Sequence, residues 1–226
     1  IVLLVVFFLF QNKESNTNVE KHSFSLDNNI ELRIDSLIET LTLEEKVGQT
    51  CQITLDAVLI KDDKGILLEP HQIDQQKLEE ALLTYNVGSI LNVSNHTFTL
   101  EKWREIITNI QNTAKTSNHR IPVIYGIDAI HGATYIQNST LFPQEIGLAA
   151  TWDTVHARIM GEITAYETRA SGVAWNFSPV LDLGRNPIWS RLFETLGEDV
   201  YLTKNMGKSI VKGYQGDGMI DKYHVA

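Results

Sequence analysis

The chain has 226 residues, of which 43% are hydrophobic and 21% are charged, and its formal net charge is -9. This composition is typical of a globular protein with one large domain or two small ones. An acidic chain without a cluster of Lys and Arg is a poor partner for nucleic acid or for an anionic membrane surface, so a neutral or cationic small substrate is the class left open.

The amino-terminal segment differs from the rest of the chain. Residues 1–10 (IVLLVVFFLF) are wholly apolar, and ten residues are fewer than the about 20 that span a bilayer. They resemble the core of a secretory signal whose beginning is missing, so we expect an exported, periplasmic or extracellular protein with no other membrane contact. An anchor, or a segment foreign to the protein, is the alternative. The polar residues 11–28 are interpreted as a flexible linker, and 29–226 as the folded domain.

The remaining sequence alternates between two kinds of periodicity. Apolar residues at helical spacing predict helices over 29–40, 74–85, 99–116, 153–171 and 199–214. A capping-box pattern from Thr42 to Glu45 predicts a further short helix. Apolar runs predict strands over 47–55, 87–93, 121–128 and 173–181, with an irregular loop over 56–72. The single cysteine, Cys51, allows no intrachain disulfide and is expected to be a small buried residue.

Strands that alternate with helices indicate βαβ units and a parallel sheet. The links from helix to strand are short, whereas the links from strand to helix are long, at 128–152 and 182–198. Long loops at the carboxyl ends of parallel strands are where barrel enzymes bind substrate. We therefore predict an α/β fold in which about the first half of a (β/α)8 TIM-type barrel is present, since a full barrel takes roughly 250 residues.

Two of these strand ends carry polar side chains. Asp128 and His131 follow the third strand, and Asp182, Arg185 and Asn186 follow the fourth. Carboxylates and guanidinium groups that meet at one sheet edge suit the hydroxyl groups of a sugar. The sequence contains no Gly-rich phosphate loop and no HExxH, CxxC or GxSxG pattern, which argues against P-loop, zinc-protease and α/β-hydrolase chemistry.

Several segments in a fixed order resemble one family. These are LTLEEKVGQ (41–49), GIDAIHG (126–132), LFPQEIGLAATWD (141–153), FSPVLDLGRNPIWSR (177–191) and FETLGED (193–199). They are similar to the amino-terminal barrel of glycoside hydrolase family 3, whose members are mostly exo-acting, retaining β-glucosidases. The resemblance covers 41–226 and implies hydrolysis of terminal, non-reducing β-D-glucosyl residues of oligosaccharides, with no metal or organic cofactor.

The resemblance also assigns roles to individual residues. Asp128 matches the aspartate that binds hydroxyls of the non-reducing-end sugar, and Arg185 matches the sugar-binding arginine. The family's Lys-His pair, nucleophile and acid/base are expected beyond Ala226, so no catalytic residue is expected in this chain. We therefore expect an inactive fragment that supplies part of the glycon subsite, its partner being the missing carboxyl-terminal half and a further domain.

The match is imperfect after Arg185. Asn186, Ile188 and Ser190 differ from the residues that are common at these positions in the family. The resemblance is therefore a weaker basis for assigning roles to the neighbouring Trp189 and Arg191. His131 is interpreted as a structural loop residue. Three acidic residues are expected to cap the next helix or to pair with Arg191: Glu194, Glu198 and Asp199. A β-N-acetylhexosaminidase, a β-xylosidase, a non-catalytic sugar-binding protein and a phosphate-binding barrel are the alternative functions.

Overall fold

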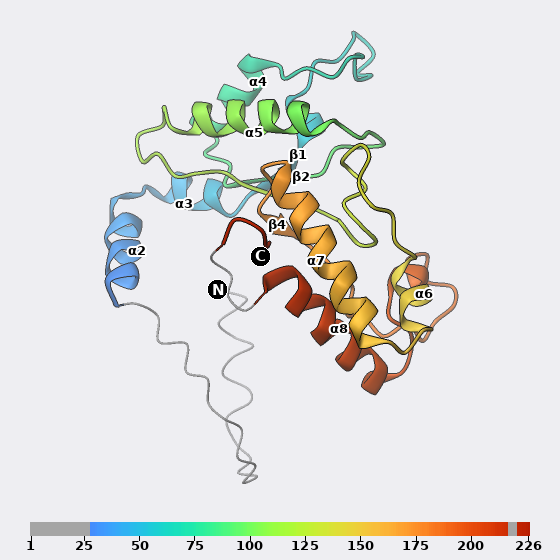
Figure 1. Cartoon of the computed structure of the whole chain (residues 1–226). Coiled ribbons are helices and arrows are strands. Elements are labelled where there is room, and N and C mark those ends of the chain that lie inside the picture. Colours follow the sequence, from blue (N-terminus) through green and yellow to red (C-terminus); the bar gives the residue numbers. More distant parts are fainter. Residues whose placement is uncertain (1–27, 217–220) are drawn as a thin grey trace. The chain divides into compact units, whose positions relative to one another are not determined.

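The computed structural model describes residues 28–216 and 221–226, and the chain divides into a unit of residues 1–41 and a unit of residues 42–226 (Figure 1). In the first unit, helix α2 (Asn28–Thr40) confirms the helix predicted over 29–40. The expected signal segment, 1–10, and nearly all of the expected linker, 11–28, lie outside the described residues. The second unit contains the sheet and all of the residues assigned above to the sugar site.

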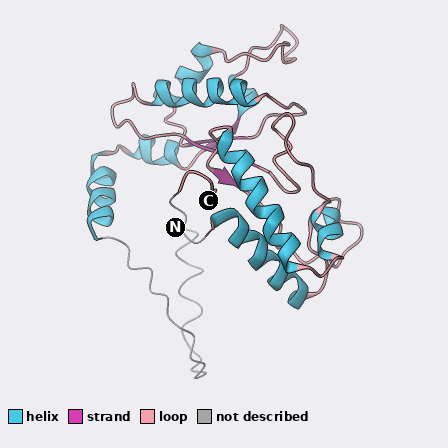
Figure 2. Ribbon diagram, viewed as in Figure 1, coloured by secondary structure: helices cyan, strands magenta, loops and turns pink. Residues whose placement is uncertain are grey.

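Four parallel strands form the sheet of the second unit (Figure 2). They are β1 (Gln52–Thr54), β2 (Ser89–Leu91), β3 (Ile124–Ile127) and β4 (Trp175–Asn176), and their order in the sheet is their order in the chain. Helices connect successive strands, as parallel pairing requires. The predicted α/β fold, with βα units like those of half a (β/α)8 barrel, is confirmed.

The last residues of the chain extend this sheet. The amide of Asn176 donates to the carbonyl of Ala226, and the amide of Ala226 donates to the carbonyl of Ala174, both at 3.0 Å. The Val225 amide donates to the carbonyl of Tyr214 at 2.9 Å, and Val225 is buried with 2% of its surface exposed. Ala226 therefore lies beside β4, on the side opposite to β3.

Helices of the second unit follow the predicted order, and most begin at a side-chain cap. They are α3 (Leu43–Gln49), α4 (Gln75–Glu79) with a π-helical turn (Glu80–Thr84), α5 (Leu100–Ala114), α6 (Glu145–Ala149), α7 (Thr154–Ala170) and α8 (Val200–Gln215). The Thr42 hydroxyl accepts from the Glu45 amide at 3.2 Å, and the Glu45 carboxylate accepts from the Thr42 amide at 2.8 Å, so the predicted capping box is present. Each such cap satisfies backbone amides that a helix leaves unpaired.

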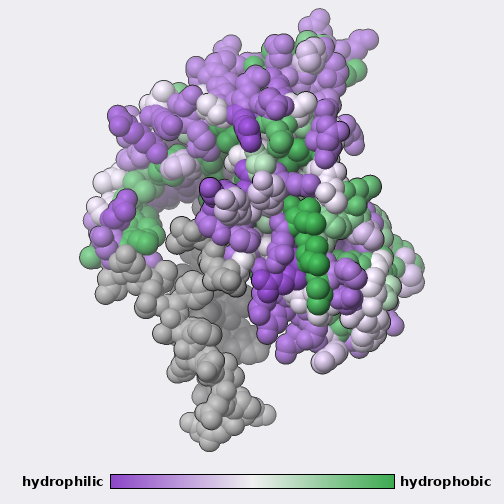
Figure 3. Space-filling model, viewed as in Figure 1, coloured by the Kyte–Doolittle hydropathy of each residue, from purple (hydrophilic) through white to green (hydrophobic). Residues whose placement is uncertain are grey.

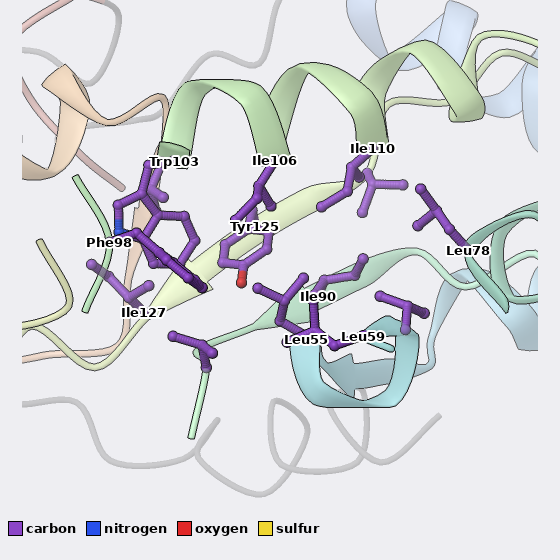
Figure 4. Close-up of a cluster of buried hydrophobic side chains, with 14 of the residues drawn as sticks. Leu55, Leu59, Leu78, Ile90, Phe98, Trp103, Ile106, Ile110, Tyr125 and Ile127 are labelled. Atoms are coloured by element: carbon purple, nitrogen blue, oxygen red, sulfur yellow. The ribbon is translucent and has the colours of Figure 1, made fainter. Parts of the chain in front are cut away.

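One hydrophobic core lies between the sheet and helices α4 and α5 (Figure 4). Trp103 on α5 is fully buried, and its ring makes edge contacts with Phe98 and with Tyr125 on β3. The Trp103 indole donates to the carbonyl of Tyr135 at 2.8 Å. Burying such side chains contributes about 1.5–3 kcal/mol each, so this core holds the strand ends that carry Asn92 and Asp128.

A second core joins α6, α7 and α8, with Met160, Met206 and Ile210 fully buried. At Gly161 a Cβ would lie 2.6 Å from the carbonyl oxygen of Ile210, so glycine lets the α7 and α8 backbones approach closely.

Figure 3 shows apolar side chains gathered along the outer side of α7, whose exposed apolar residues include Val155. In the described residues, no helix is long and apolar enough to cross a membrane.

The structure corrects two predictions near the start of this unit. The strand predicted over 47–55 is wrong at both ends, because residues 47–49 belong to α3 and residues 55–58 form a 3-10 turn. The prediction that Cys51 is buried is also wrong, because it lies exposed in the link from α3 to β1. The long loop predicted over 128–152 contains α6, whose five residues are too few to give a clear periodic pattern.

Candidate functional site

The site is organised around Asp128, the residue that follows β3. The Asp128 carboxylate accepts a hydrogen bond through Oδ2 from the Asn92 side-chain amide at 2.6 Å, and the Asp128 backbone amide donates to Asn92 Oδ1 at 2.9 Å. Asn92 follows β2 and has a positive φ of 45°, a backbone conformation that asparagine tolerates better than most residues. The two strand ends thus hold the carboxylate by a two-point contact, and within the described residues Oδ1 has no protein donor.

Asp128 lines a polar cavity of about 420 Å³ at the carboxyl edge of the sheet. The cavity is lined by Asp128, Ile130, His131, Thr134, Tyr135, Gln144, Arg191, Phe193 and Glu194. Its volume exceeds what a single water needs and lies within the range of small-ligand sites. The carboxylates, hydroxyls, guanidinium and aromatic ring around it match the donors and acceptors of a polyhydroxylated ligand.

Arg191 and Glu194 form one wall of this cavity. The guanidinium of Arg191 contacts Glu194 Oε2 through Nη2 at 2.6 Å and through Nε at 2.7 Å. This hydrogen bond, together with the charges of Glu194, Asp128 and Asp182, raises the pKa of Arg191. The predicted pairing of Glu194 with Arg191 is confirmed, and it holds the Arg191 guanidinium, whose charge Glu194 balances, in the wall of the cavity that Asp128 also lines.

Tyr135 stands between this cavity and a second one. Its half-buried ring also lines a neighbouring cavity of about 520 Å³, together with Asp56, Asn92 and Ser94. Burial first, and then the charges of Asp128 and Glu194, raise the pKa of the Tyr135 phenol, so it remains a neutral hydroxyl. A neutral phenol can donate to, or accept from, a substrate hydroxyl.

His131 mainly supports the loop that follows β3. Its Nδ1 lies 3.1 Å from the carbonyl oxygen of Phe142, and the Phe142 amide donates to the His131 carbonyl at 2.9 Å. Because a carbonyl only accepts, Nδ1 carries the proton in this contact. These contacts agree with the structural role predicted for His131, which also lines the cavity.

The structure places Arg185 differently from Asp128. Arg185 is exposed and lies outside the residues that line the cavity, and the Arg185 amide closes a tight turn on the carbonyl of Leu183 at 2.9 Å. Trp189 is half-buried and likewise lies outside the lining residues. The arginine that the structure brings to Asp128 is Arg191, so a role for Arg185 in sugar binding stays a prediction.

A buried polar network lies next to the site and reaches the residue after Asp128. The Glu145 carboxyl on α6 accepts from the Ser178 hydroxyl at 3.0 Å and from the Val180 amide at 3.2 Å. Burial raises the pKa of Glu145 to about 8, because these hydrogen bonds offset only part of the desolvation. The Tyr214 hydroxyl lies 3.0 Å from the Ser178 hydroxyl and donates to the carbonyl of Ala129 at 3.3 Å. The network therefore links α6, β4 and α8 to the residue after Asp128.

Sequence reasoning overlooked several residues of the site, above all Asn92 and Asp56. Each follows a strand of the sheet, as Asp128 does, so the rule that singled out Asp128 would have found them with accurate strand ends. The Asp56 carboxylate accepts from the backbone amide and the hydroxyl of Ser94. Within the described residues, the Asp128 cavity holds no group of three metal-ligating side chains close enough to share an ion.

The family comparison covers nearly the whole second unit. Residues 42–224 match the model described as glycosyl hydrolase family 3 N terminal domain. A lysosomal beta glucosidase of Dictyostelium discoideum is 38% identical over 192 residues, which are 81% of this chain and 22% of the relative.

Two solved structures resemble the chain. The exo-1,3/1,4-beta-glucanase of a Pseudoalteromonas species has a TM-score of 0.72 at 28% identity, covering 93% of this chain and 25% of that enzyme. A beta-glucosidase of Listeria innocua, in complex with glucose, has a TM-score of 0.66 at 32% identity, covering 86% of this chain and 26% of that enzyme. The chain therefore spans about a quarter of the length of these proteins.

Proposed function

Because the chain belongs to glycosyl hydrolase family 3, as its N-terminal domain, we propose that the whole protein hydrolyses terminal, non-reducing β-D-glucosyl residues of oligosaccharides with retention of configuration. The similarity to a beta glucosidase and to an exo-beta-glucanase supports this substrate class. This chain supplies part of the glycon subsite, and the nucleophile and acid/base belong to the rest of the protein.

The observation that carries the proposal is the geometry of Asp128. A carboxylate held by Asn92, with one oxygen without a protein donor among the described contacts, is suited to accept hydrogen bonds from one or two sugar hydroxyls. Arg191 and Tyr135 add a cation and a neutral hydroxyl on neighbouring walls of the same cavity. Hydrogen bonds to charged groups contribute about 1.5–3 kcal/mol, so Asp128 should dominate the recognition of the sugar.

Binding of glucose to this chain tests the proposal directly. In ligand-observed NMR, Asp128→Asn should weaken glucose binding at least tenfold, because the neutral amide loses the charge-assisted hydrogen bonds. The matched control is Asp63→Asn, an exposed aspartate in the loop between β1 and β2. Far-ultraviolet circular dichroism verifies that both variants fold. Equal binding by Asp128→Asn and the wild type would overturn the assignment.

Substrate class is tested on the whole protein with aryl β-glycosides. We expect the highest kcat/KM on the β-glucoside, and a large loss in Asp128→Asn. Preference for the β-xyloside or the N-acetyl-β-glucosaminide would replace the glucosidase proposal by one of those activities. Absence of turnover on all three, with glucose binding intact, would indicate a non-catalytic sugar-binding protein.

We further propose that residues 1–10 direct export, to the periplasm or the extracellular space. The proposal rests on ten consecutive apolar residues followed by a polar segment. A fusion of an initiating Met and residues 1–28 to a reporter that is active only after export tests it. Replacement of Leu4 and Phe7 by Asp should then retain the reporter in the cytoplasm, whereas export by both fusions, or by neither, would contradict the proposal.

A further inference from the structure

Glu69, His71 and His96 meet where two loops of the second unit touch. The Nδ1 atom of His71 lies 3.2 Å from Glu69 Oε2, and the Nδ1 atom of His96 lies 3.5 Å from Glu69 Oε1. Each of the three side chains offers one ligand atom, and these atoms all lie within 4.8 Å of one another. The group is independent of the Asp128 cavity, whose lining includes none of the three residues.

These separations approach those of a tetrahedral metal site. Zinc binds histidine nitrogen at about 2.0–2.1 Å and carboxylate oxygen at about 2.0–2.2 Å, so neighbouring ligand atoms of a tetrahedron lie about 3.3–3.5 Å apart. The distances from His71 Nδ1 to Glu69 Oε2, 3.2 Å, and from His96 Nδ1 to Glu69 Oε1, 3.5 Å, are close to this length, and they end on the two different oxygens of the carboxylate. Two imidazoles and one carboxylate suit zinc, whereas calcium and magnesium require more oxygen ligands.

One ligand of the group is fixed, and two can adjust. His71 is buried with 6% of its surface exposed, and its ring stands edge-on to Phe98. The His96 ring, which stacks on His71 with centroids 4.3 Å apart, is partly exposed, and Glu69 is exposed. His96 and Glu69 can therefore turn toward a shared ion, and the ion can enter from solvent.

Binding of a metal ion to this group would replace the proton on the Nδ1 atom of His71. The His71 Nδ1 atom lies 3.1 Å from the carbonyl oxygen of Leu68 as well as close to Glu69, so without a metal it donates its proton to these acceptors. A metal ion in that position would displace the proton and bring the His71 nitrogen, the His96 nitrogen and the Glu69 carboxylate together. Release of a proton on binding is the usual consequence for a histidine ligand.

Other histidines of the chain show that a histidine–carboxylate contact alone does not form such a group. His119, His156 and His224 each contact one carboxylate, on Glu45, Asp153 and Asp221. Over residues 28–216 and 221–226, only the group of Glu69, His71 and His96 brings three ligand atoms within 4.8 Å. A second imidazole therefore distinguishes this group from an ordinary ion pair.

We propose that Glu69, His71 and His96 bind a divalent transition-metal ion of the zinc class, with the fourth position left to solvent. The ion joins the loop between β1 and α4 to the loop between β2 and α5. Because these loops follow β1 and β2, the ion fixes the side of the sheet edge where Asp56 and Ser94 lie. Its role is to hold this edge in place.

Zinc binding by the tag-free chain tests the proposal. All proteins carry Cys51→Ser, because an exposed thiol would bind zinc by itself. In titration calorimetry with zinc chloride, we expect one ion per chain, at least tenfold weaker binding in Glu69→Gln and in His96→Ala, and unchanged binding in the control His156→Ala. The control removes an exposed histidine that contacts a single carboxylate.

Thermal unfolding gives a second readout. Each protein is compared with itself in zinc and in EDTA, so a change in stability that the substitution causes by itself cancels. Zinc should raise the Tm of the wild type and of His156→Ala over their values in EDTA, and should leave the Tm of Glu69→Gln nearly unchanged. The proposal is overturned if the wild type binds no zinc at micromolar concentration. It is equally overturned if Glu69→Gln and His96→Ala bind zinc as tightly as the wild type does.

Discussion

Glu145 gives the sharpest prediction, because its carboxyl group is fully buried and must remain protonated at neutral pH. Its pKa of about 8 exceeds the 4.5 of a solvated glutamate. That difference corresponds to ~4–5 kcal/mol at 1.36 kcal/mol per pH unit. Since the folded state binds the proton more tightly than the unfolded state does, this contribution is fully present below pH 4.5 and is lost as pH rises toward 8.

The substitution Glu145→Gln keeps the shape of the side chain and removes the titration. Its amide oxygen can still accept from the Ser178 hydroxyl, as the protonated acid does. We therefore expect wild-type stability to fall by ~3 kcal/mol between pH 5 and pH 8 through this residue alone, and the variant to lack this fall. At pH 8 the variant should be the more stable protein.

Urea unfolding at pH 5, 6.5 and 8 measures this difference. Glu198→Gln is the control, because Glu198 is exposed and its amide variant should follow the wild type at every pH. The slope of the unfolding free energy against denaturant must be equal in all three proteins for the comparison to hold. If the free energies of the wild type and Glu145→Gln stay parallel from pH 5 to pH 8, the reasoning on the buried carboxyl is refuted.

Two further predictions concern the neighbourhood of Asp128. Asn92→Ala removes both contacts to Asp128 and should lower the free energy of unfolding by ~2 kcal/mol more than Asn95→Ala does. Asn95 is the control because its φ of 49° imposes the same backbone strain. Equal Tm losses in the two variants would contradict a stabilising contact between Asn92 and Asp128. Gly126→Ala places a Cβ 2.4 Å from the Phe177 ring and should cost ~1–3 kcal/mol, whereas Gly147→Ala on α6, with 3.4 Å to its nearest neighbour, should not destabilise the chain. Thermal unfolding measures both pairs, and equal Tm values for the two alanine variants would rule out the steric account.

The sequence predicted the helices better than the strands, for a physical reason. The structure reproduces the cap signal at Thr42, and α5, α7 and α8 present long apolar faces to the cores. The strands have only two to four residues, and the apolar runs around β2 and β3 continue beyond the strand ends to residues that are also buried, namely Val87, Val93 and Val123. An apolar run therefore marks burial near a strand without giving its ends.

The candidate site was predictable only where a residue lies next to a strand. Asp128 was found because it ends the apolar run of β3, and the structure places it in a polar cavity. Arg191 enters that cavity and Arg185 does not, because the 3-10 turn Leu192–Glu194 and the ion pair to Glu194 determine where the loop turns. Such contacts between residues of one irregular loop leave no periodic signal in the sequence.

The order of the sheet has a consequence for how this unit forms during synthesis. Because β1 to β4 pair in the order in which they are made, each new strand finds its partner already present, and no strand has to wait for a distant one. The entropy lost on closing each connection grows only slowly with its length, so successive βα units should add with similar costs. Until the next unit covers it, the outer side of the newest strand remains an open hydrogen-bonding edge, and β4 is partly covered there by Ala226. Growth of the sheet thus moves its newest open edge away from Asn92 and Asp128, which follow strands that are already paired.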